Sequence, residues 1–261
     1  MTPPPLLSIE GLSRSFGALA AVRDLSLTVD DGEILGVIGP NGAGKTTTVN
    51  LMAGAIRPTG GRVTFGGENV TGLKPHELAR RGLVRTFQAT TVFGTQTVRE
   101  NCLRGAYLHL WPGFFSTLFS TRPARAMRQA VEQEVDRLLD WLGMQEVATT
   151  EARTLPYGMQ KTLGMAIALA ARPRLILLDE PVAGMSAQET DHVLGTIRRI
   201  RDAGVSAIVI DHNMRFISGL CDRVLVLHHG QVLASGKPAD VMRDPAVVEA
   251  YLGTSHAAQA K

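Results

Sequence analysis

The fold of this chain is decided by one stretch, residues 34–47, which reads Ile34-Leu35-Gly36-Val37-Ile38-Gly39-Pro40-Asn41-Gly42-Ala43-Gly44-Lys45-Thr46-Thr47. Its first part is continuously apolar, which is typical of a strand that is buried on both faces. The rest matches the pattern GxxxxGK[ST] at every fixed position, directly after that strand and before a plausible helix. Glycines let backbone N–H groups turn toward phosphate oxygens, and the helix presents its positive end to them. The stretch therefore predicts a nucleotide-phosphate site.

The residue types in this loop indicate separate tasks. Lys45 supplies a mobile cation for the β- and γ-phosphates, the Thr46 hydroxyl is the expected Mg²⁺ ligand, and Thr47 can add a hydrogen bond to phosphate. The competing dinucleotide pattern GxGxxG does not fit the glycine spacing. The remaining ATP-binding residues expected in the loop are Gly39, Pro40, Asn41, Gly42, Ala43 and Gly44.

Two carboxylates follow a second apolar run. Residues 175–178 are all apolar, and Asp179 and Glu180 come directly after them. In a fold with a phosphate loop the strand ends converge on that loop. Asp179 is suited to hold Mg²⁺ through water, and Glu180 can polarise the attacking water. These residues predict a site for nucleotide hydrolysis.

Short apolar strands alternate with helical patterns along the chain, which predicts a largely parallel α/β core. Around residues 125–143, apolar residues recur at spacings of three and four, so a helix is expected there, as part of an insertion. The other expected elements are strands at 6–9, 21–29, 34–38, 62–65, 175–178 and 205–210, a helix over 187–202, and a hairpin of 224–227 with 232–234 around His229-Gly230.

Composition excludes several classes of protein. With 44% apolar and 20% charged residues in 261, the chain is typical of globular proteins, and a net charge of +3 does not indicate a nucleic-acid partner. Cys102 and Cys221 are far apart, which argues against a disulfide framework and structural zinc and fits a reducing cytosol. We expect no secretory signal and no membrane crossing, because no apolar stretch reaches the roughly 18 residues that a spanning helix needs.

With these motifs in order, residues 6–253 resemble the ATP-binding subunit of ABC transporters. The resemblance implies that Phe16 stacks on adenine, that Gln88 senses Mg²⁺, and that His212 contacts the γ-phosphate. Taken singly, Phe16 could be a half-buried strand residue, Gln88 a surface residue and His212 a core histidine. Their order and spacing around the two motifs favour the functional interpretation, with Lys45, Glu180 and His212 as catalytic residues and Thr46, Gln88 and Asp179 at Mg²⁺.

The resemblance also implies a domain organisation. The expected fold is a P-loop NTPase core with a mixed, largely parallel sheet and flanking helices, an N-terminal antiparallel β-subdomain and an inserted α-helical subdomain. We expect a single ATPase domain over 1–253. Its nucleotide-binding core and β-subdomain would take 6–88 and 166–235, its helical subdomain 89–165, and a C-terminal extension with disordered last residues 236–261.

Further features are similar to bacterial importers of branched-chain amino acids. They imply a subunit that binds ATP and Mg²⁺ at the cytoplasmic face of the inner membrane as a peripheral protein. Its expected partners are a second homologous ATPase or a second copy, two transmembrane permeases and a substrate-binding protein, with no nucleic acid. The features are Arg85-Thr86-Phe87-Gln88, Ala183-Gly184-Met185-Ser186, Asp211-His212-Asn213-Met214, Gly236-Lys237-Pro238, and the segment 244–253.

The family signature motif departs from its usual form. Residues 155–160 read Leu155-Pro156-Tyr157-Gly158-Met159-Gln160, where the family uses a serine hydroxyl and N–H groups on the partner's γ-phosphate. Pro156 offers neither a hydroxyl nor an N–H, whereas Gly158 and a helix N-terminus remain. Ser186 replaces an expected aspartate. The alternative hypothesis is therefore a regulatory or weakly active ATP-binding subunit.

Other questions are less well defined by the residues alone. The pair His228-His229 is interpreted as a surface turn rather than a metal site. The apolar segment 111–119 could contact permeases or lipid, or pack inside the helical insertion. A soluble ABC ATPase of translation or repair is a third class, but the chain has neither two phosphate loops nor a long coiled coil. The identity of the transported solute is implied by the resemblance alone, and urea, amides and aromatic acids remain possible.

Overall fold

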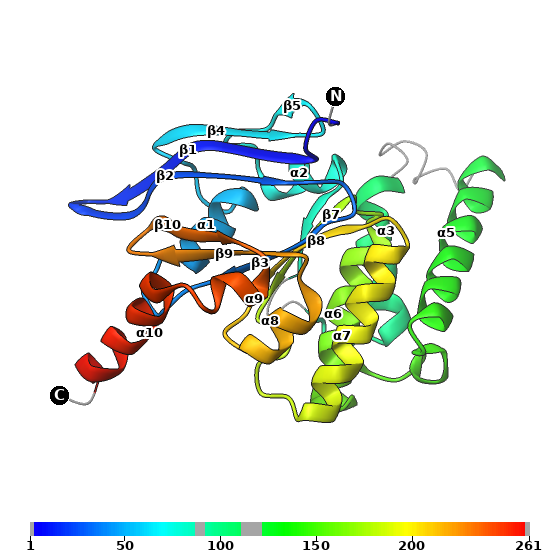
Figure 1. The fold of residues 1–261 in the computed structure, drawn as a ribbon. Coiled ribbons are helices and arrows are strands. Elements are labelled where there is room, and N and C mark those ends of the chain that lie inside the picture. Colours follow the sequence, from blue (N-terminus) through cyan, green and yellow to red (C-terminus); the bar gives the residue numbers. More distant parts are fainter. Residues whose placement is uncertain (1–2, 87–91, 111–121, 259–261) are drawn as a thin grey trace. The chain divides into compact units, whose positions relative to one another are not determined.

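The structure is a computed structural model that describes residues 3–86, 92–110 and 122–258 (Figure 1). The chain forms two compact units, one of Met1–Leu78 with Arg174–Lys261 and one of Ala79–Pro173. In the described part of the chain, no helix combines the length and the apolarity that a bilayer crossing requires.

The first unit begins with an antiparallel sheet whose strands follow the order β2-β1-β4-β5. Its long pair extends from Leu7 opposite Val29 to Phe16 opposite Leu19, with register shifts after Ile9. The sequence predicted only 6–9 and 21–29, because polar residues interrupt the apolar pattern where one face of β1 meets solvent. The predicted antiparallel sheet is confirmed. Its strands are β1 (Leu7–Phe16), β2 (Leu19–Val29), β4 (Gly60–Phe65) and β5 (Glu68–Asn69).

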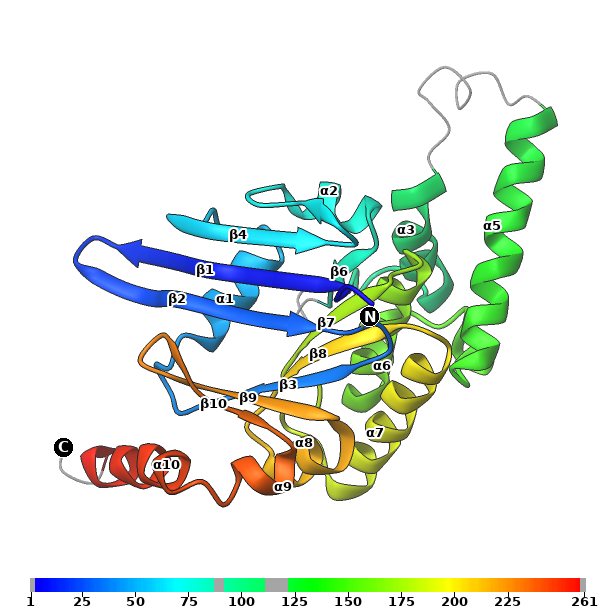
Figure 2. The same cartoon turned by 45° about the horizontal axis from the view of Figure 1, so that its top comes forward.

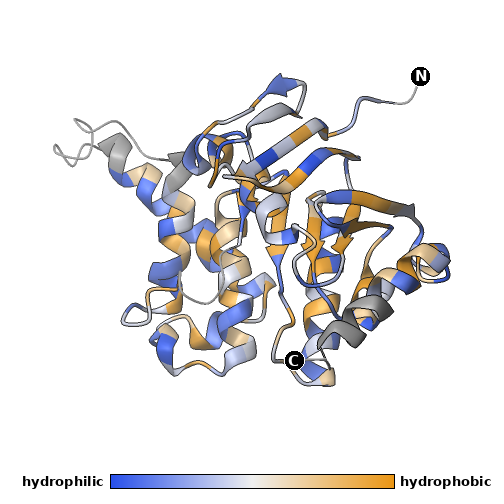
Figure 3. Cartoon of the chain, turned by 90° about the vertical axis from the view of Figure 1, so that its left-hand side faces the viewer, coloured by the Kyte–Doolittle hydropathy of each residue, from blue (hydrophilic) through white to orange (hydrophobic). Residues whose placement is uncertain are grey.

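A second sheet forms the core of this unit, and its strands here follow the order β10-β9-β3-β8-β7. β3 pairs in parallel with β8 and β9, and β7 pairs in parallel with β8, whereas β9 and β10 form a hairpin. β3 and β8 are buried along their whole length, and hydrophobic residues follow the strands (Figure 3). The predicted, largely parallel sheet is confirmed. Its strands are β3 (Ile34–Ile38), β7 (Leu175–Asp179), β8 (Ser206–Ile210), β9 (Arg223–His228) and β10 (Gln231–Gly236).

Helices cover these sheets. α1 packs against β2, as Figure 2 shows, and α10 packs against β10. α7 spans the residues predicted for it, because a capping box defines its start: the Ser186 hydroxyl accepts a hydrogen bond from the Glu189 N–H, and the Glu189 carboxylate accepts one from the Ser186 N–H. The helices are α1 (Lys45–Met52), α7 (Ala187–Asp202), α8 (Met214–Leu220), α9 (Pro238–Val241) and α10 (Pro245–Ala258), and α2 (Pro75–Arg80) crosses into the second unit.

The second unit is mainly helical, and α3 packs against both α5 and α6. Their buried residues, among them Val98, Leu139 and Leu163, form one apolar cluster. The helix expected at 125–143 is found as α5, which ends earlier because Gly143 adopts a positive φ of 71°. The elements are β6 (Leu83–Arg85), α3 (Val98–Leu110), α5 (Arg122–Trp141), η2 (Gln145–Val147), η3 (Ala152–Thr154) and α6 (Tyr157–Ala170).

Candidate functional site

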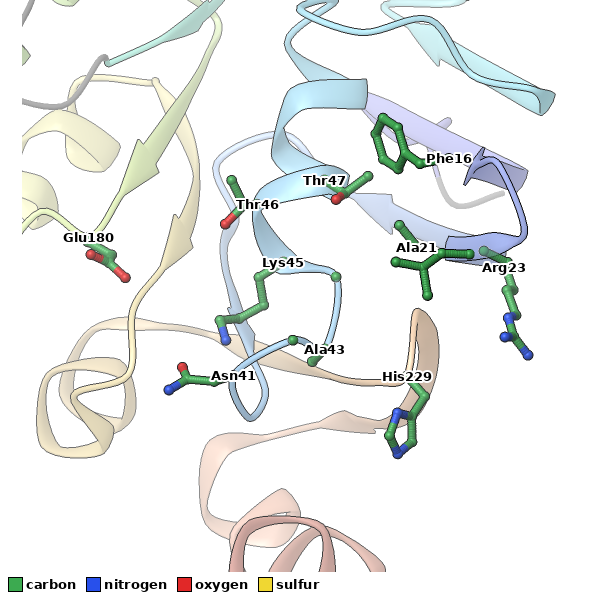
Figure 4. Close-up of a pocket in the computed structure, with 14 residues that line it drawn as sticks. Phe16, Ala21, Arg23, Asn41, Ala43, Lys45, Thr46, Thr47, Glu180 and His229 are labelled. Carbon is green, nitrogen blue, oxygen red and sulfur yellow. The ribbon is translucent and has the colours of Figure 1, made fainter. Parts of the chain in front are cut away.

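A cavity of about 460 Å³ opens in the first unit at the phosphate loop (Figure 4). This volume is in the range of pockets that hold a small ligand. It brings together an exposed aromatic ring, the phosphate loop and one carboxylate, which come from β1, the β3–α1 connection and the end of β7. The lining residues are Phe16, Leu19, Ala20, Ala21, Arg23, Asn41, Gly42, Ala43, Gly44, Lys45, Thr46, Thr47, Glu180 and His229.

The phosphate loop is held in shape by its own lysine. The Lys45 ammonium donates hydrogen bonds to the carbonyl oxygens of Gly39 at 2.7 Å and Pro40 at 2.9 Å. The Ala43 N–H donates to the same Pro40 carbonyl at 3.2 Å. Gly39 and Pro40 do not line the cavity, but their carbonyl oxygens bind the Lys45 ammonium, which does. The backbone N–H groups at the start of α1 remain available to anions.

β2, the phosphate loop and the turn between β9 and β10 pack too closely to admit a side-chain atom at Gly44 or Gly230. A Cβ added to Gly44 or to Gly230 would lie 2.6 Å from the carbonyl oxygen of Ala21 in β2. The Gly230 N–H donates to the Ala43 oxygen at 3.0 Å, and the Arg23 N–H donates to the Gly230 oxygen at 2.8 Å. The turn between β9 and β10 thus joins β2 to the phosphate loop.

The carboxylate that lines the cavity has an uncommon backbone conformation. Glu180 has a positive φ of 48°, and its N–H donates to the Ile210 oxygen at 2.8 Å. Non-glycine residues rarely adopt this conformation, and it occurs often at functional sites. His212 Nδ1 lies 4.0 Å from Glu180 Oε1 and 3.9 Å from Oδ1 of the buried Asp211. Glu180 and His212 are therefore neighbours, although His212 does not line the cavity.

Burial lowers the pKa of the Lys45 ammonium below its usual range, and the carboxylates of Glu180 and Asp179 act in the opposite direction. A cation that is partly desolvated interacts strongly with anions, because little water screens it. Lys45, which follows β3, and Glu180, which follows β7, line the same cavity, so the ends of these two strands lie close together. The convergence expected from the sequence is present.

The oxygen atoms at this site suit Mg²⁺. Thr46 lines the cavity with Glu180, and Asp179 is the residue before Glu180. Hydroxyl and carboxylate oxygens are the ligands that Mg²⁺ prefers, and it is commonly held by one or two protein groups together with substrate phosphates. Among the described residues, no group of three or more His, Cys, Asp or Glu is placed to hold a metal. A site that relies on nucleotide phosphates does not need such a group.

The signature residues lie in the second unit, at the start of α6. Pro156 is the N-cap, and its oxygen accepts from the Gln160 N–H at 3.0 Å, while the Gln160 side-chain amide donates to the Leu155 oxygen at 2.9 Å. Met159 packs against the helical core, so an apolar side chain at this position has a structural use. Tyr157 is 46% exposed beside Gly158, and both belong to the first turn of the helix.

Other sequence expectations have different outcomes. Gln88 and the apolar segment 111–119 lie outside the described residues. The sequence interpretation missed Arg23 and His229 as lining residues. Arg23 is part of an ordinary alternating strand, and His229 lines the cavity because the hairpin turn folds back onto Ala43. The one signal in the sequence for this placement is that His229 precedes Gly230 in an expected turn.

Comparisons with known proteins match nearly the whole chain. The family model described as ABC transporter matches residues 22–183, and one described as branched-chain amino acid ATP-binding cassette transporter matches residues 231–257. The high-affinity branched-chain amino acid transport ATP-binding protein BraF of Pseudomonas aeruginosa is 38% identical, over 95% of this chain and 98% of its own length. LivG of Salmonella typhimurium, with the same description, is 39% identical over 95% and 98%. A crystal structure of an ATP-binding cassette of an ABC transporter in its ADP conformation superposes with a TM-score of 0.84 at 27% identity, covering 96% of this chain and 100% of that one.

Proposed function

The chain belongs to the ABC transporter family as one of its ATP-binding and ATP-hydrolysing proteins, and we propose that it drives the import of branched-chain amino acids or related small polar solutes. The observation that supports a complete nucleotide site is that Phe16, the phosphate loop and Glu180 line the same cavity. The printed descriptions of BraF and LivG support the solute class.

In the proposed orientation of ATP, the adenine lies at Phe16 and the phosphates lie at the phosphate loop. Phe16 stacks on adenine at the exposed end, and the loop residues Asn41, Gly42, Ala43, Gly44, Lys45, Thr46 and Thr47 surround the phosphates, while Gly39 and Pro40 hold Lys45 in place. Lys45 stabilises charge on the β- and γ-phosphates, and stacking adds modest, base-tolerant affinity. Mg²⁺, held by Thr46 and Asp179 with Gln88, would neutralise phosphate charge when bound.

Hydrolysis needs a group that orients water, and Glu180 takes this role. Its carboxylate accepts a proton from the attacking water, and His212, 4.0 Å away, contacts the γ-phosphate. The test is Glu180→Gln, which keeps the size of the side chain and removes its basicity. We expect ATP binding to be retained and turnover to fall at least about tenfold. Glu249→Gln, an exposed change on α10, is the control, and equal turnover in the two variants would refute the role of Glu180.

We propose that two ATPase subunits, this chain with a homologue or with a second copy, enclose each nucleotide. The phosphate loop of one subunit would face residues 155–160 of the other. Because Pro156 brings neither an N–H nor a hydroxyl, this signature offers fewer hydrogen bonds than the usual one, and a hydrogen bond to a charged group contributes about 1.5–3 kcal/mol.

The smaller number of hydrogen bonds from this signature favours a second candidate function, an ATP-binding subunit that is regulatory or only weakly active as an ATPase. Replacing Pro156 with Ser and Met159 with Gln discriminates between the two, measured in the assembled transporter. If the departures weaken the site, ATPase activity should rise, and unchanged activity would favour a fully competent signature.

The assembly proposed here includes two transmembrane permeases and a substrate-binding protein, with the ATPases peripheral at the cytoplasmic face of the inner membrane. The functional ATPase domain would extend over 1–253, with 236–261 as a C-terminal extension. Uptake of radiolabelled leucine by cells with and without this gene tests the solute class. Normal leucine uptake together with a defect for urea, amides or aromatic acids would reassign the solute without changing the ATPase.

A further inference from the structure

The aromatic ring that lines the nucleotide cavity carries a cation on one face. The guanidinium carbon of Arg14 lies over the Phe16 ring, 4.7 Å from its centroid. From this contact we propose that Arg14 fixes the orientation of Phe16 and that the base of the nucleotide stacks on the opposite face of the ring. Arg14 is then a positioning residue, because it acts through Phe16 and not on the nucleotide. The proposal rests on the function proposed above, since it requires that Phe16 receives the base of ATP.

A second segment of the chain holds the guanidinium in place. Its Nη1 donates a hydrogen bond to the carbonyl oxygen of Arg57 at 2.9 Å. The same segment is tied to the backbone before Arg14, because the Thr59 N–H donates to the Ser13 oxygen at 2.8 Å. Arg14 is half-buried, and its Nε is shielded from solvent. A desolvated cation interacts more strongly with an aromatic face than an exposed one does, so this contact can keep the ring in one orientation.

The cavity meets Phe16 on a side that Arg14 does not cover. Phe16 is 47% exposed and lines the cavity, whereas the lining residues that the structure describes do not include Arg14. Leu19 pairs directly with Phe16 across β1 and β2, is 67% exposed and also lines the cavity. Residues that pair directly across two strands have neighbouring side chains. Two large apolar side chains therefore lie together where the base is expected.

A ring that is held before the ligand arrives binds a base more tightly than a free one. An exposed side chain that becomes ordered on binding lowers the affinity, because its rotational freedom is lost at that moment. The contact with Arg14 removes part of this cost in advance. Stacking on an aromatic ring requires a base and not a phosphate. The effect of Arg14 should therefore be confined to ligands that carry a base.

The experiment measures how tightly the full chain binds ATP and inorganic tripolyphosphate, which has the phosphates but no base. Both compete with a fluorescent ATP analogue whose own affinity is determined for each variant. Arg14→Met keeps a long apolar side chain and removes the cation. We expect about two- to fivefold weaker ATP binding. Tripolyphosphate affinity should stay at the parental value, which also shows that the variant is folded.

The matched control is Arg104→Met. Arg104 lies over the Phe93 ring at 4.2 Å from its centroid, in the same kind of contact, but both residues belong to the second unit and neither is a lining residue of the nucleotide cavity. ATP affinity should not change in this variant.

A double-mutant cycle with Phe16→Ala shows whether Arg14 acts through the ring. Arg14→Met should weaken ATP binding in the parent and have no effect in Phe16→Ala. An equal loss in both backgrounds would overturn the inference, and so would a parallel loss of tripolyphosphate affinity or a parental ATP affinity in Arg14→Met. Tighter ATP binding would overturn it too, because Arg14 would then occupy the face that the base needs. If the parent protein binds neither ATP nor tripolyphosphate, the proposed function itself fails.

Discussion

Gly230 offers a sharp test of how the hairpin turn supports the phosphate loop. The change is Gly230→Ala, and Gly204→Ala is its matched control. Both glycines have positive φ, 78° and 88°, but a Cβ at Gly204 would meet nothing within 4 Å, whereas a Cβ at Gly230 would lie 2.6 Å from the Ala21 oxygen and 3.2 Å from the Val22 Cα. The two variants therefore share the backbone strain and differ in the steric clash.

The magnitudes follow from these two terms. A left-handed conformation costs an alanine about 1–2 kcal/mol, which is the loss of unfolding free energy that we expect for Gly204→Ala. Forcing an atom into a packed site costs about 1–3 kcal/mol more. Gly230→Ala should then lose about 2–5 kcal/mol in total. The entropy that alanine removes from the unfolded chain is the same at both positions and cancels in the comparison.

Urea unfolding followed by circular dichroism measures this difference. Tryptophan fluorescence is less suitable, because Trp141 belongs to the second unit, whereas both glycines belong to the first. ATP affinity provides the second readout and should fall in Gly230→Ala only, since the turn contacts Ala43 of the loop. Equal stabilities within about 0.5 kcal/mol, with equal ATP affinities, would refute the proposed support of the loop by the turn.

Three further outcomes are expected. Ser186→Ala should cost about 0.5–2 kcal/mol of unfolding free energy by removing the capping box of α7, whereas Ser186→Asp should cost little; equal losses would contradict the cap. Burial raises the pKa of Cys102 and Cys221 to about 12, so neither thiol should react with Ellman's reagent at pH 8 until urea is added, and rapid native labelling would show exposure. A hydrogen bond from Arg99 holds the pKa of Asp136 below its usual range. The ion pair therefore stabilises the folded state at neutral pH, and this stabilisation is lost as the pH falls through the lowered pKa. Asp136→Asn should lower the unfolding free energy by about 0.5 kcal/mol at pH 7, and the variant and the parent should become equally stable in acid.

The sequence allowed the phosphate loop and the central strands to be predicted because their signals are local. β3 was predicted to the residue, since five consecutive buried residues leave no polar position to blur its ends. β1 was predicted too short, because after Leu12 its residues are half-buried or exposed. This part of the strand is defined by pairing with β2 and not by its own apolarity.

The additional lining residues could not be predicted for a different reason. His229 is more than 180 residues from Ala43, and only the packing of the hairpin turn on the loop brings them together. The pair His228-His229 was therefore interpreted as a surface turn, and His229 is indeed exposed, but it is also a lining residue of the cavity. Ser186, which stands where the resemblance implies an aspartate, begins α7 with a local hydrogen-bond pattern.

The two hydrogen bonds from Lys45 to Gly39 and Pro40 also take up two of the three N–H donors of the ammonium. A phosphate can accept from the third donor while both carbonyl oxygens stay bound. The orientation of the lysine is then fixed before any ligand arrives. A cation that is held in advance loses little conformational freedom on binding, which is the advantage of a preorganised site.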